Sequence, residues 1–498
     1  MAASPDLLAL QAAAIQFDDA GTSRSLVAAR VDGWGMSSHA VVRLARPRSV
    51  AGVQAVFELA ATHGWTVGLR GAGRSYGDAA LNEAGIVLDF CDFATVQWWE
   101  PTTGHIVVDP GVTIGQVWQH VVGDGWWPPV VSGTMFPTVA GAAAMNIHGK
   151  NNYKAGPIGD WIERFRLVTP VGEIVDCSRD DNADLFHAAI SGFGMLGVMV
   201  DIELRLKPVG SGRVEVEPAW APNLAAMFER FEAYIGDPAT AADYCVGWID
   251  AFGSGRSLGR GQIHAAWALS ADQDPEGRVL LDAAAQALPD RLFGLIPKVW
   301  MWRLIKPFST PLGMRAINLA KVLASRFGPK GRYRQSHAGF HFLLDYVPDW
   351  KRIYEPGGLI QFQSFVPKET ALATFERLLR MQQERGLVNW LSVIKRHRPD
   401  SFLLTHALDG WSLAQDFAIT DRNRVAVWQL CQDMAAIVVD AGGRFYPAKD
   451  STLSPAHWRA SHGDERLDAF VALKARVDPD ARMQTNLSRR LFRSGTAD

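Results

Sequence analysis

The spacing of apolar residues between positions 41 and 206 alternates between a helical period and short strand-like runs. Val50, Val53, Val56 and Phe57 recur at helical spacing, which predicts a helix. Short apolar runs next to glycine or proline predict strands. The elements expected on these grounds are helices over 49–63 and 114–122 and strands over 66–69, 86–90 and 106–108. Strands and helices in this mixed order predict an α+β domain.

Beyond residue 207 the expected elements become longer. The pattern predicts a strand over 358–365 and a helix over 370–385. From residue 440 a loop with the sequence GGRFYPAKDS precedes a helix near 465–477. This change indicates a second domain between residues 207 and 440.

Composition and charge narrow the class of protein. The 498 residues include 50 Lys and Arg against 52 Asp and Glu, a formal charge of −2, and 48% of them are hydrophobic. Such a chain is not a general nucleic-acid binder, and it has enough apolar residues for a large core. We find neither a basic and apolar secretory leader nor an apolar run of the roughly 20 residues that a spanning helix needs. We therefore expect a cytoplasmic protein.

The cysteines are few and widely separated. Cys91, Cys177, Cys245 and Cys431 form no C-x-x-C pair, which argues against a zinc site and against a dense disulfide framework. We expect them to be buried as small hydrophobic residues, and we expect no metal site.

One segment departs from the neutral balance, because residues 291–344 contain no Asp or Glu. Within it, LFGLIPKVWMWRLIKPF mixes aromatic and aliphatic side chains with cations, as segments in a membrane interface do. Two core helices with solvated basic edges would give the same pattern. Contact of 291–334 with a membrane surface or lipid tail, and a peripheral location, is therefore one of two expectations. The basic residues are Arg291, Lys298, Arg303, Lys306, Arg315, Lys321, Arg326, Lys330, Arg332 and Arg334.

Three glycine-rich stretches lie between expected elements. In RGAGRSYGD (70–78) three glycines let the backbone approach an anion closely, and the expected ligand is a diphosphate. In SGTMFPTVAGAAAMN (132–146) small residues leave room for a large flat ligand. Glycine-rich turns are also common in proteins that bind no ligand there, so neither stretch by itself identifies a binding site. GFGMLG (192–197) has the spacing of the dinucleotide fingerprint, but the helix expected before it and the strand after it are in the wrong order for that motif.

These stretches, in this order, resemble the vanillyl-alcohol-oxidase/p-cresol-methylhydroxylase flavoprotein superfamily. The resemblance covers nearly the whole chain from about residue 30 and rests on RGAGRSYGD, GTMFPTVA (133–140), IHGKN (147–151), GFGMLGV (192–198) and DPDARMQTNLSRRL (478–491). Within the superfamily the chain is most similar to the decaprenylphosphoryl-ribose oxidase group, through LIQFQSFVP (359–367), VIKR (393–396), GWSLAQDF (410–417) and GGRFYPAKDS (442–451).

The resemblance implies an α+β fold with a two-subdomain FAD-binding domain of the p-cresol-methylhydroxylase type at residues 20–207. It places an inserted antiparallel-sheet substrate domain at 208–439 and a C-terminal segment at 440–498 that returns to the FAD-binding domain. Carried over position by position, the cofactor-binding residues are Arg70, Gly71, Ala72, Gly73, Arg74, Ser75, Tyr76, Gly133, Thr134, Thr138, Val139, Ala140, Gly141, Met145, Asn146, His148, Gly194, Gly197, Met199 and Tyr446.

The resemblance also implies a set of reacting and substrate-binding side chains. The catalytic residues implied are Lys449, His148, Tyr76, Lys395, Gln363 and Gln361, and the substrate-binding residues are Lys150, Gln363 and Lys395. Lys449 would contact the flavin N1/C2 edge or the substrate hydroxyl, whereas without the resemblance a solvated lysine is the ordinary interpretation.

His148 and the two glutamines have plainer interpretations too. His148 fits either a flavin contact or proton acceptor, or a core histidine bonded to the backbone. Gln361 and Gln363 flank Phe362 on an expected strand and so share a face. Two amides on one face suit a polyhydroxylated ligand, although a solvent-facing strand edge would carry them equally well.

The chain departs from the superfamily pattern at several positions. Many members tether FAD through a His in the first loop or a Cys in the second, but this chain has Arg74 before Ser75 and no Cys in the second loop. We therefore expect noncovalent FAD. Ser412 and Ala414 stand where the mycobacterial enzymes have an Asn and a Cys, which leaves the substrate open.

The function implied is FAD-dependent oxidation of a secondary hydroxyl to a ketone by hydride transfer to flavin N5. The expected substrate is a small-molecule or lipid-linked sugar, polyprenyl-phosphate-linked in one version, with a short-chain reductase as a candidate partner. The alternatives are a soluble aldose or polyol oxidase that uses O₂, and a flavoenzyme similar to sterol side-chain reductases. Two non-enzymatic alternatives also remain. One is a binding protein that keeps the flavin domain but catalyses no reaction, and the other is a membrane-interaction module.

Overall fold

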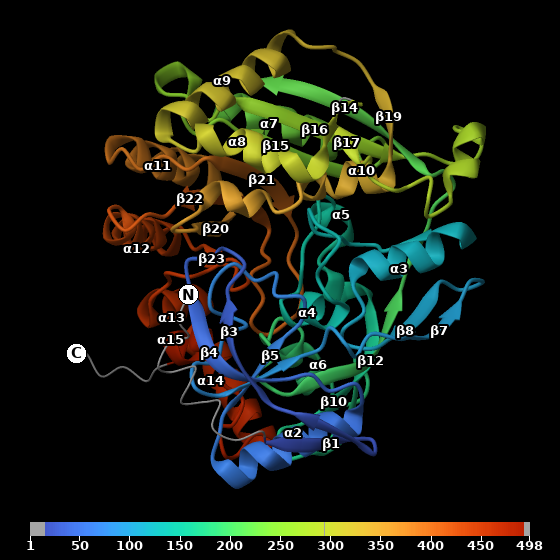
Figure 1. The fold of residues 1–498 in the computed structure, drawn as a ribbon. Coiled ribbons are helices and arrows are strands. Elements are labelled where there is room, and N and C mark those ends of the chain that lie inside the picture. Colours follow the sequence, from blue (N-terminus) through green and yellow to red (C-terminus); the bar gives the residue numbers. More distant parts are fainter. Residues whose placement is uncertain (1–14, 293, 493–498) are drawn as a thin grey trace.

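The protein is described here by a computed structural model, which covers residues 15–292 and 294–492. Figure 1 shows a lower part that combines the N-terminal segments, coloured blue to blue-green, with the C-terminal helices in red, and an upper part built on one large sheet. Three main sheets organise the chain, and the candidate site lies where their loops meet.

The first sheet has the strand order β3-β4-β6-β5, in which β4, β6 and β5 are parallel neighbours. Helix α2 connects β4 to β5; it begins where Ser49 accepts a hydrogen bond from Gly52 N, and it ends at Gly64 with φ 65°. The hairpin of β1 and β2 packs on this helix. The bounds are β1 Gln16–Asp19, β2 Thr22–Ser25, β3 Val27–Asp32, β4 His39–Ala45, α2 Val50–His63, β5 Val67–Arg70 and β6 Ile86–Asp89.

The second sheet is antiparallel, with the order β11-β10-β12-β8-β7. Helix α3 begins with a reciprocal capping box between Thr113 and Gln116, and Thr138 caps α4. The bounds are β7 Val96–Glu100, β8 His105–Val108, α3 Ile114–Val121, β9 Trp126–Trp127, α4 Val139–Ala144, α5 Asn152–Ala155, β10 Ile162–Val168, β11 Ile174–Ser178, α6 Ala183–Ala189, β12 Val198–Arg205 and β13 Lys207–Pro208.

The third and largest sheet is also antiparallel and has the order β19-β14-β16-β15-β21-β22-β20-β23. Helices α7, α11 and α12 contact one face of it. The bounds are β14 Arg213–Ala221, α7 Leu224–Ile235, β15 Tyr244–Ile249, β16 Gly261–Ala268, β17 Arg291–Leu292, β18 Ile296–Pro297, α8 Met301–Ile305, α9 Pro311–Phe327, β19 Tyr333–Ser336, α10 His337–His341, β20 Leu359–Pro367, α11 Ala371–Glu384, β21 Leu391–His397, β22 Gly410–Ala418, α12 Arg424–Asp440 and β23 Arg444–Phe445.

The opposite face of this sheet carries the candidate site and helix α9. Trp248 on β15 pairs with Val393 on β21, so both side chains point to the same face. Val393 lines the cavity described below, and the Lys321 Nζ on α9 lies 4.1 Å from the centroid of the Trp248 ring. Helix α9 therefore covers the sheet beside the cavity.

The C-terminal helices return to the lower part of the molecule. They are α13 Pro455–His462, α14 Asp464–Val477 and α15 Asn486–Leu491. Arg490 on α15 donates to both Asp78, at the end of the first glycine-rich loop, and Asp450. The last turn of the described chain is thus bonded to two segments that border the site.

The elements expected from periodicity lie within one or two residues of these bounds. The helix over 49–63 is α2, the strand over 358–365 is β20 and the helix over 370–385 is α11. The expectation for the cysteines is wrong at one position, because Cys91 is exposed while the other three are buried. Cys91 lies just after β6, where the chain leaves the sheet for the surface. Among the described residues no helix has both the length and the apolar composition to cross a membrane.

Candidate active site

A cavity of about 950 Å³ lies between the two glycine-rich loops and the open face of the large sheet. The first loop follows β5, the second precedes α4, and strands β20, β21 and β22 supply a polar wall. A volume of this size is within the range of roughly 300–1,000 Å³ that large ligands occupy in proteins.

Close backbone contacts hold the first loop against its neighbours. A Cβ at Gly71 would lie 2.3 Å from the Thr138 Oγ1, and a Cβ at Gly77 would lie 2.0 Å from the Asp450 carbonyl oxygen. Gly73 has φ +62°, a conformation that side chains rarely adopt. The glycines therefore let the first loop meet both the second loop and the segment that carries Lys449.

The second loop is anchored to the wall of the cavity by a carboxylate. Thr134 Oγ1 donates to Asp345 Oδ1 at 2.7 Å, and the Met135 backbone N donates to Asp345 Oδ2 at 2.9 Å. Leu344 N also donates to the Gly133 carbonyl at 3.1 Å. These bonds fix the loop relative to residues 343–351, which line the mouth of the cavity.

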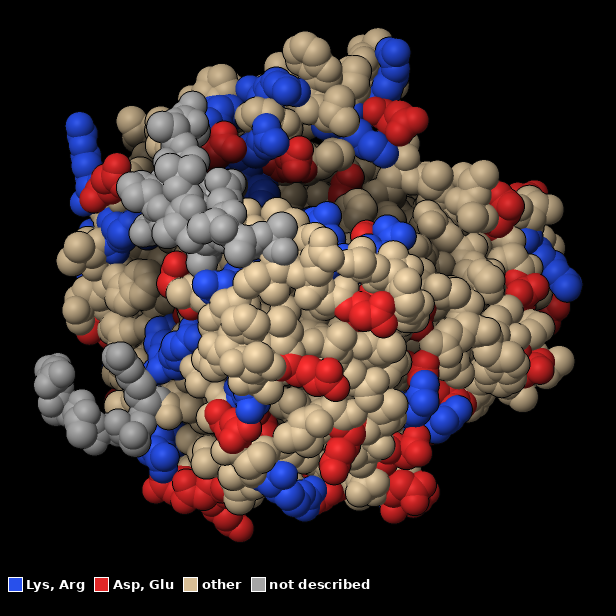
Figure 2. Space-filling view, turned by 60° about the horizontal axis from the view of Figure 1, so that its bottom comes forward, with Lys and Arg blue, Asp and Glu red and all other residues tan. Residues whose placement is uncertain are grey.

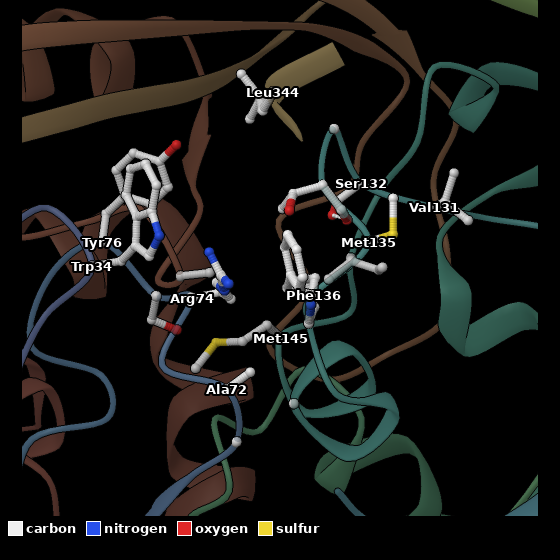
Figure 3. Close-up of a pocket in the computed structure, with 18 of the residues that line it drawn as sticks. Trp34, Ala72, Arg74, Tyr76, Val131, Ser132, Met135, Phe136, Met145 and Leu344 are labelled. Atoms are coloured by element: carbon white, nitrogen blue, oxygen red, sulfur yellow. Dashed lines mark hydrogen bonds between the residues drawn. The ribbon is translucent and has the colours of Figure 1, made fainter. Parts of the chain in front are cut away.

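Arg74 projects from the first loop into the cavity (Figure 3). Its guanidinium lies 4.5 Å from the centroid of the Phe136 ring, which comes from the second loop. Among the described residues its buried Nε has no hydrogen-bond partner, and burial lowers the pKa of Arg74. A buried cation with an unused donor beside a glycine-rich backbone fits an anionic group such as the diphosphate of FAD.

The sheet wall brings an amine and a carboxyl group together. Lys449 Nζ lies 3.5 Å from the centroid of the Tyr76 ring, and Asp416 on β22 accepts a hydrogen bond from the Gln361 side chain. Burial lowers the pKa of Lys449, and the negative charge of Asp416 raises it again. Burial raises the pKa of Asp416, which the Gln361 hydrogen bond and Lys449 oppose. Both groups therefore titrate much closer to neutrality than their exposed counterparts.

His148, Gln363 and Lys395 form a second polar group on the same wall. Gln363 Nε2 lies 3.0 Å from His148 Nε2, and Lys395 Nζ lies 3.5 Å from His148 Nδ1. Burial and the nearby cations, Lys395 first among them, hold the pKa of His148 well below its usual value. Burial also lowers the pKa of Lys395 to about 8. His148 is thus neutral near pH 7, and each of its ring nitrogens has a polar neighbour within the protein.

Lys150 is buried at the far end of the polar wall. It donates to the Phe340 carbonyl and lies 4.1 Å from the centroid of the Phe340 ring. Burial, with a contribution from Lys395, holds its pKa well below the usual lysine value. An ammonium group with so little solvent is available to an anionic part of a ligand in the cavity.

The cavity brings together nearly all of the residues that the sequence singled out. Every proposed catalytic and substrate-binding residue lines it. Two of the residues predicted to bind the cofactor, Val139 and Asn146, do not line it. Val139 is in the core, and its backbone N donates to Val112 O. Asn146 accepts from Gly159 N and donates to Asp400, so both residues support the second loop from behind.

The strand carrying Gln361 and Gln363 is not a solvent-facing edge. The strand β20 lies between β22 and β23, and both glutamines are buried on the cavity face. The order of α6, the third glycine stretch and β12 also agrees with the rejection of a dinucleotide fingerprint there. Gly194 and Gly197 instead face the cavity with φ +73° and +142°.

Sequence reasoning missed several residues of the site. Asp416 is a buried carboxylate in a strand whose other residues are uncharged, and that anomaly was visible in GWSLAQDF. Nothing in the sequence around Asp345 marked it as a residue of the site. Trp34 lies with its ring centroid 4.6 Å from that of Tyr76 and 5.0 Å from that of Trp350. This aromatic group borders the cavity opposite Phe136 (Figure 3).

A set of buried histidines predicts acid sensitivity. Burial lowers the pKa of His337, His406 and His462 to about 3. In the unfolded chain a histidine binds a proton near pH 6.5, so below that pH the unfolded state takes up more protons than the folded state. The free energy of unfolding is therefore expected to fall as pH decreases from about 6.5 toward 3.

Urea unfolding at fixed flavin concentration between pH 7.5 and 5.5 measures this slope. His406 has no hydrogen-bond partner for either ring nitrogen among the described residues. His406→Phe should therefore reduce the slope by up to about 1.4 kcal/mol per pH unit. An unchanged slope in that variant would contradict the assignment of a neutral, buried His406.

Comparison with known proteins agrees with this geometry. Residues 42–178 match the family described as FAD binding domain, a range that contains both glycine-rich loops of the cavity. The chain is 28% identical over 472 residues to decaprenylphosphoryl-beta-D-ribose oxidase of Mycolicibacterium smegmatis, which covers 93% of this chain and 97% of that protein.

Two further relatives match a smaller share of the chain. A putative D-arabinono-1,4-lactone oxidase of Neurospora crassa is 27% identical over 203 residues, 41% of this chain and 35% of that protein. Cytokinin dehydrogenase 1 of Arabidopsis thaliana is 24% identical over 211 residues, 41% of this chain and 36% of that protein.

Proposed function

We propose that this chain, an FAD-dependent oxidoreductase of the vanillyl-alcohol-oxidase/p-cresol-methylhydroxylase superfamily that acts on CH–OH groups, oxidises a secondary hydroxyl of a sugar-like substrate to a ketone. The observation that carries the proposal is a single cavity in which the FAD-binding loops face a wall of amides, amines and a carboxyl group. The full-length similarity to an oxidase named for a lipid-phosphate-linked ribose supports a substrate of that class.

The two loops would hold FAD without a covalent bond. Backbone groups of residues 71–76 and the unpaired Nε of Arg74 suit the diphosphate, and residues 133–141 with Met145 and Tyr446 border the space for the ring. When bound, FAD supplies the two-electron acceptor for the hydride of the carbinol carbon. The hydrogen bonds that Thr134 and Met135 donate to Asp345 would hold the second loop in position to bind FAD.

Lys449, assisted by Asp416, would accept the proton of the substrate hydroxyl. A lysine whose pKa is lowered by burial has a neutral fraction near pH 7, and a neutral amine accepts a proton from an alcohol. Asp416 stabilises the ammonium group that then forms. Tyr76, whose pKa burial raises well above its usual value, stays protonated and can donate to the substrate oxygen.

The amides of Gln361 and Gln363 would orient the sugar. Each offers a donor and an acceptor, which matches hydroxyl groups that do the same. Neutral His148 holds Gln363 in position. Lys395 and Lys150 would meet the phosphate of a lipid-linked substrate, because both are amines that line the cavity.

The acid limb of the rate profile provides one test. The rate of flavin reduction should rise with pH as Lys449 loses its proton, and it should reach its plateau at lower pH than an exposed lysine allows. Asp416→Asn removes the charge that raises the pKa of Lys449, so the limb should move to lower pH. Stopped-flow reduction at several pH values measures the shift, and a limb that moves to higher pH would contradict the pairing.

An anaerobic reduction screen tests the function itself. The holoprotein is mixed with free pentoses, with polyols and with a short-chain polyprenylphosphoryl pentose, and loss of the oxidised-flavin absorbance is followed. We expect the lipid-linked sugar to bleach the flavin and to lose two hydrogens by mass spectrometry. Bleaching by free polyols together with rapid O₂ consumption would instead favour a soluble polyol oxidase, and reduction by NADPH with turnover of an alkene would favour a reductase.

A ketone product also defines the next reaction. A carbonyl reductase that delivers hydride to the opposite face would complete an epimerisation, so we propose a short-chain reductase as the partner class. Accumulation of the ketone in the purified reaction, and its disappearance when such a reductase is added, measures this dependence.

A further inference from the structure

The outer face of α9 carries a row of exposed apolar side chains. Leu312, Leu319, Leu323 and Phe327 are 79%, 46%, 48% and 72% exposed, and with exposed Ala316 they follow a helical spacing of four, three, four and four residues. The inner face of the same helix is filled by buried Met314, Asn318 and Val322. Helix α9 therefore has two apolar faces, and packing within the chain accounts for only one.

A second exposed row lies in the segment that leads to α9. Trp300, Leu304 and Phe308 are 55%, 50% and 52% exposed at intervals of four residues. The turn that ends at Phe308 contacts both α8 and α9. Exposed apolar residues scattered singly are normal on a protein surface, but two adjoining rows mark an interaction site. We refer to the two rows together as the apolar ridge.

The charged residues in the segment that carries the apolar ridge are all basic. Arg303, Arg315, Arg326 and Lys330 are exposed beside it, and residues 291–344 include no acidic residue. The lower face of the molecule differs, because Figure 2 shows Lys and Arg interspersed there with Asp and Glu. The ridge is thus a local positive, apolar surface on a chain whose net charge is −2.

The apolar ridge continues into the mouth of the cavity. Lys298, in the turn that precedes Trp300, lines the cavity. Helix α9 lies on the same face of the large sheet as the cavity, through the contact of Lys321 with Trp248. The site and the ridge therefore belong to one side of the upper part, in which α8 and α9 are labelled in Figure 1.

We propose that the apolar ridge docks onto the surface of an anionic lipid bilayer. Leucine, phenylalanine and tryptophan side chains enter the boundary between headgroups and acyl chains, while Arg and Lys meet the negative headgroups. A second copy of the chain fits less well, because a two-fold contact would place the ridge on itself and bring its cations together. The proposal goes beyond the oxidation chemistry and stands independently of which hydroxyl is oxidised.

Flotation of the holoprotein with vesicles tests this docking. The vesicles are phosphatidylcholine alone, or phosphatidylcholine with phosphatidylglycerol at about 30 mol%. We expect binding to the anionic vesicles at least about tenfold tighter than to the neutral ones, and weaker binding when salt is added. Equal recovery on both kinds of vesicle, or no recovery on either, would overturn the proposal.

Two variants and a matched control locate the contact. Leu312→Gln/Leu319→Gln/Leu323→Gln removes part of the apolar ridge, and Arg315→Gln/Arg326→Gln/Lys330→Gln removes its charge. The control, Val279→Gln/Val425→Gln/Val471→Gln, changes side chains that are 78%, 82% and 50% exposed in other parts of the chain.

Each ridge variant should lower vesicle binding at least about tenfold, and the control should leave it unchanged. Bound flavin and thermal unfolding are measured for all three variants, so that loss of folding is seen separately. Equal binding by the leucine variant and the control would overturn the assignment. So would light scattering that shows a dimer which the leucine variant converts to monomer, because the ridge would then be an interface between copies. Flavin bleaching does not enter this test, so its outcome is separate from that of the proposed reaction.

Discussion

Replacing Lys449 by alanine should slow reduction of the bound flavin by the alcohol about 10²- to 10⁴-fold while FAD stays bound. The reason is that Lys449, whose pKa is lowered by burial, is the amine beside Tyr76 and near Asp416 that can accept the hydroxyl proton. Stopped-flow absorbance under anaerobic conditions measures the rate, and the visible spectrum measures the bound flavin.

A second substitution separates the two roles that Lys449 can have. Lys449→Arg keeps the positive charge, but a guanidinium does not give up its proton. If proton transfer is the role, the arginine variant should be nearly as slow as the alanine variant. Recovery of the rate in Lys449→Arg would assign Lys449 to charge stabilisation instead. Lys368→Ala, which changes an exposed lysine bonded to Asp409, serves as the control, and an unimpaired Lys449→Ala would remove this residue from the mechanism.

Replacing Gly71 by valine should abolish most FAD binding. A Cβ at this position would lie 2.3 Å from the Thr138 Oγ1 and 3.3 Å from the Thr138 Cβ, so the first and second loops would have to separate. The cavity needs both loops for the cofactor, and we expect the dissociation constant for FAD to rise at least about 100-fold, the equivalent of roughly 2.7 kcal/mol.

Flavin released by acid precipitation, counted per chain, measures this loss. Gly123→Ala is the matched control, since an added Cβ there meets nothing within 4 Å. Thermal unfolding of the flavin-free proteins distinguishes loss of FAD from loss of the fold. Full flavin content in Gly71→Val would show that the two loops do not act together.

Much of the fold could be predicted because it depends on local patterns. Helices α2 and α11 repeat their apolar residues at one period over 14 residues each, and each of the two helices has a single buried face. Helix α9 shows the limit of this reasoning. Its sequence has apolar residues on two sides, and only the folded structure shows that the side with Met314, Asn318 and Val322 is the buried one.

The candidate site was predictable where a motif had its residues together. The first loop was found because its three glycines lie within seven consecutive residues, 71–77. Asp416 was not assigned a role because its hydrogen-bond partner Gln361 is 55 residues away in sequence, and their pairing depends on the neighbouring strands β20 and β22. Val139 and Asn146 do not line the cavity, since the motif gives their position along the loop but not the direction in which each side chain points.

The bonds of Arg490 have a consequence for biosynthesis. Its guanidinium joins Asp78 to Asp450, and Asp78 precedes it by 412 residues in the chain. The first loop is synthesised well before the arginine that holds it, so this ion pair cannot form until about 410 further residues have followed the loop out of the ribosome. We therefore expect the loop to gain this support late in synthesis.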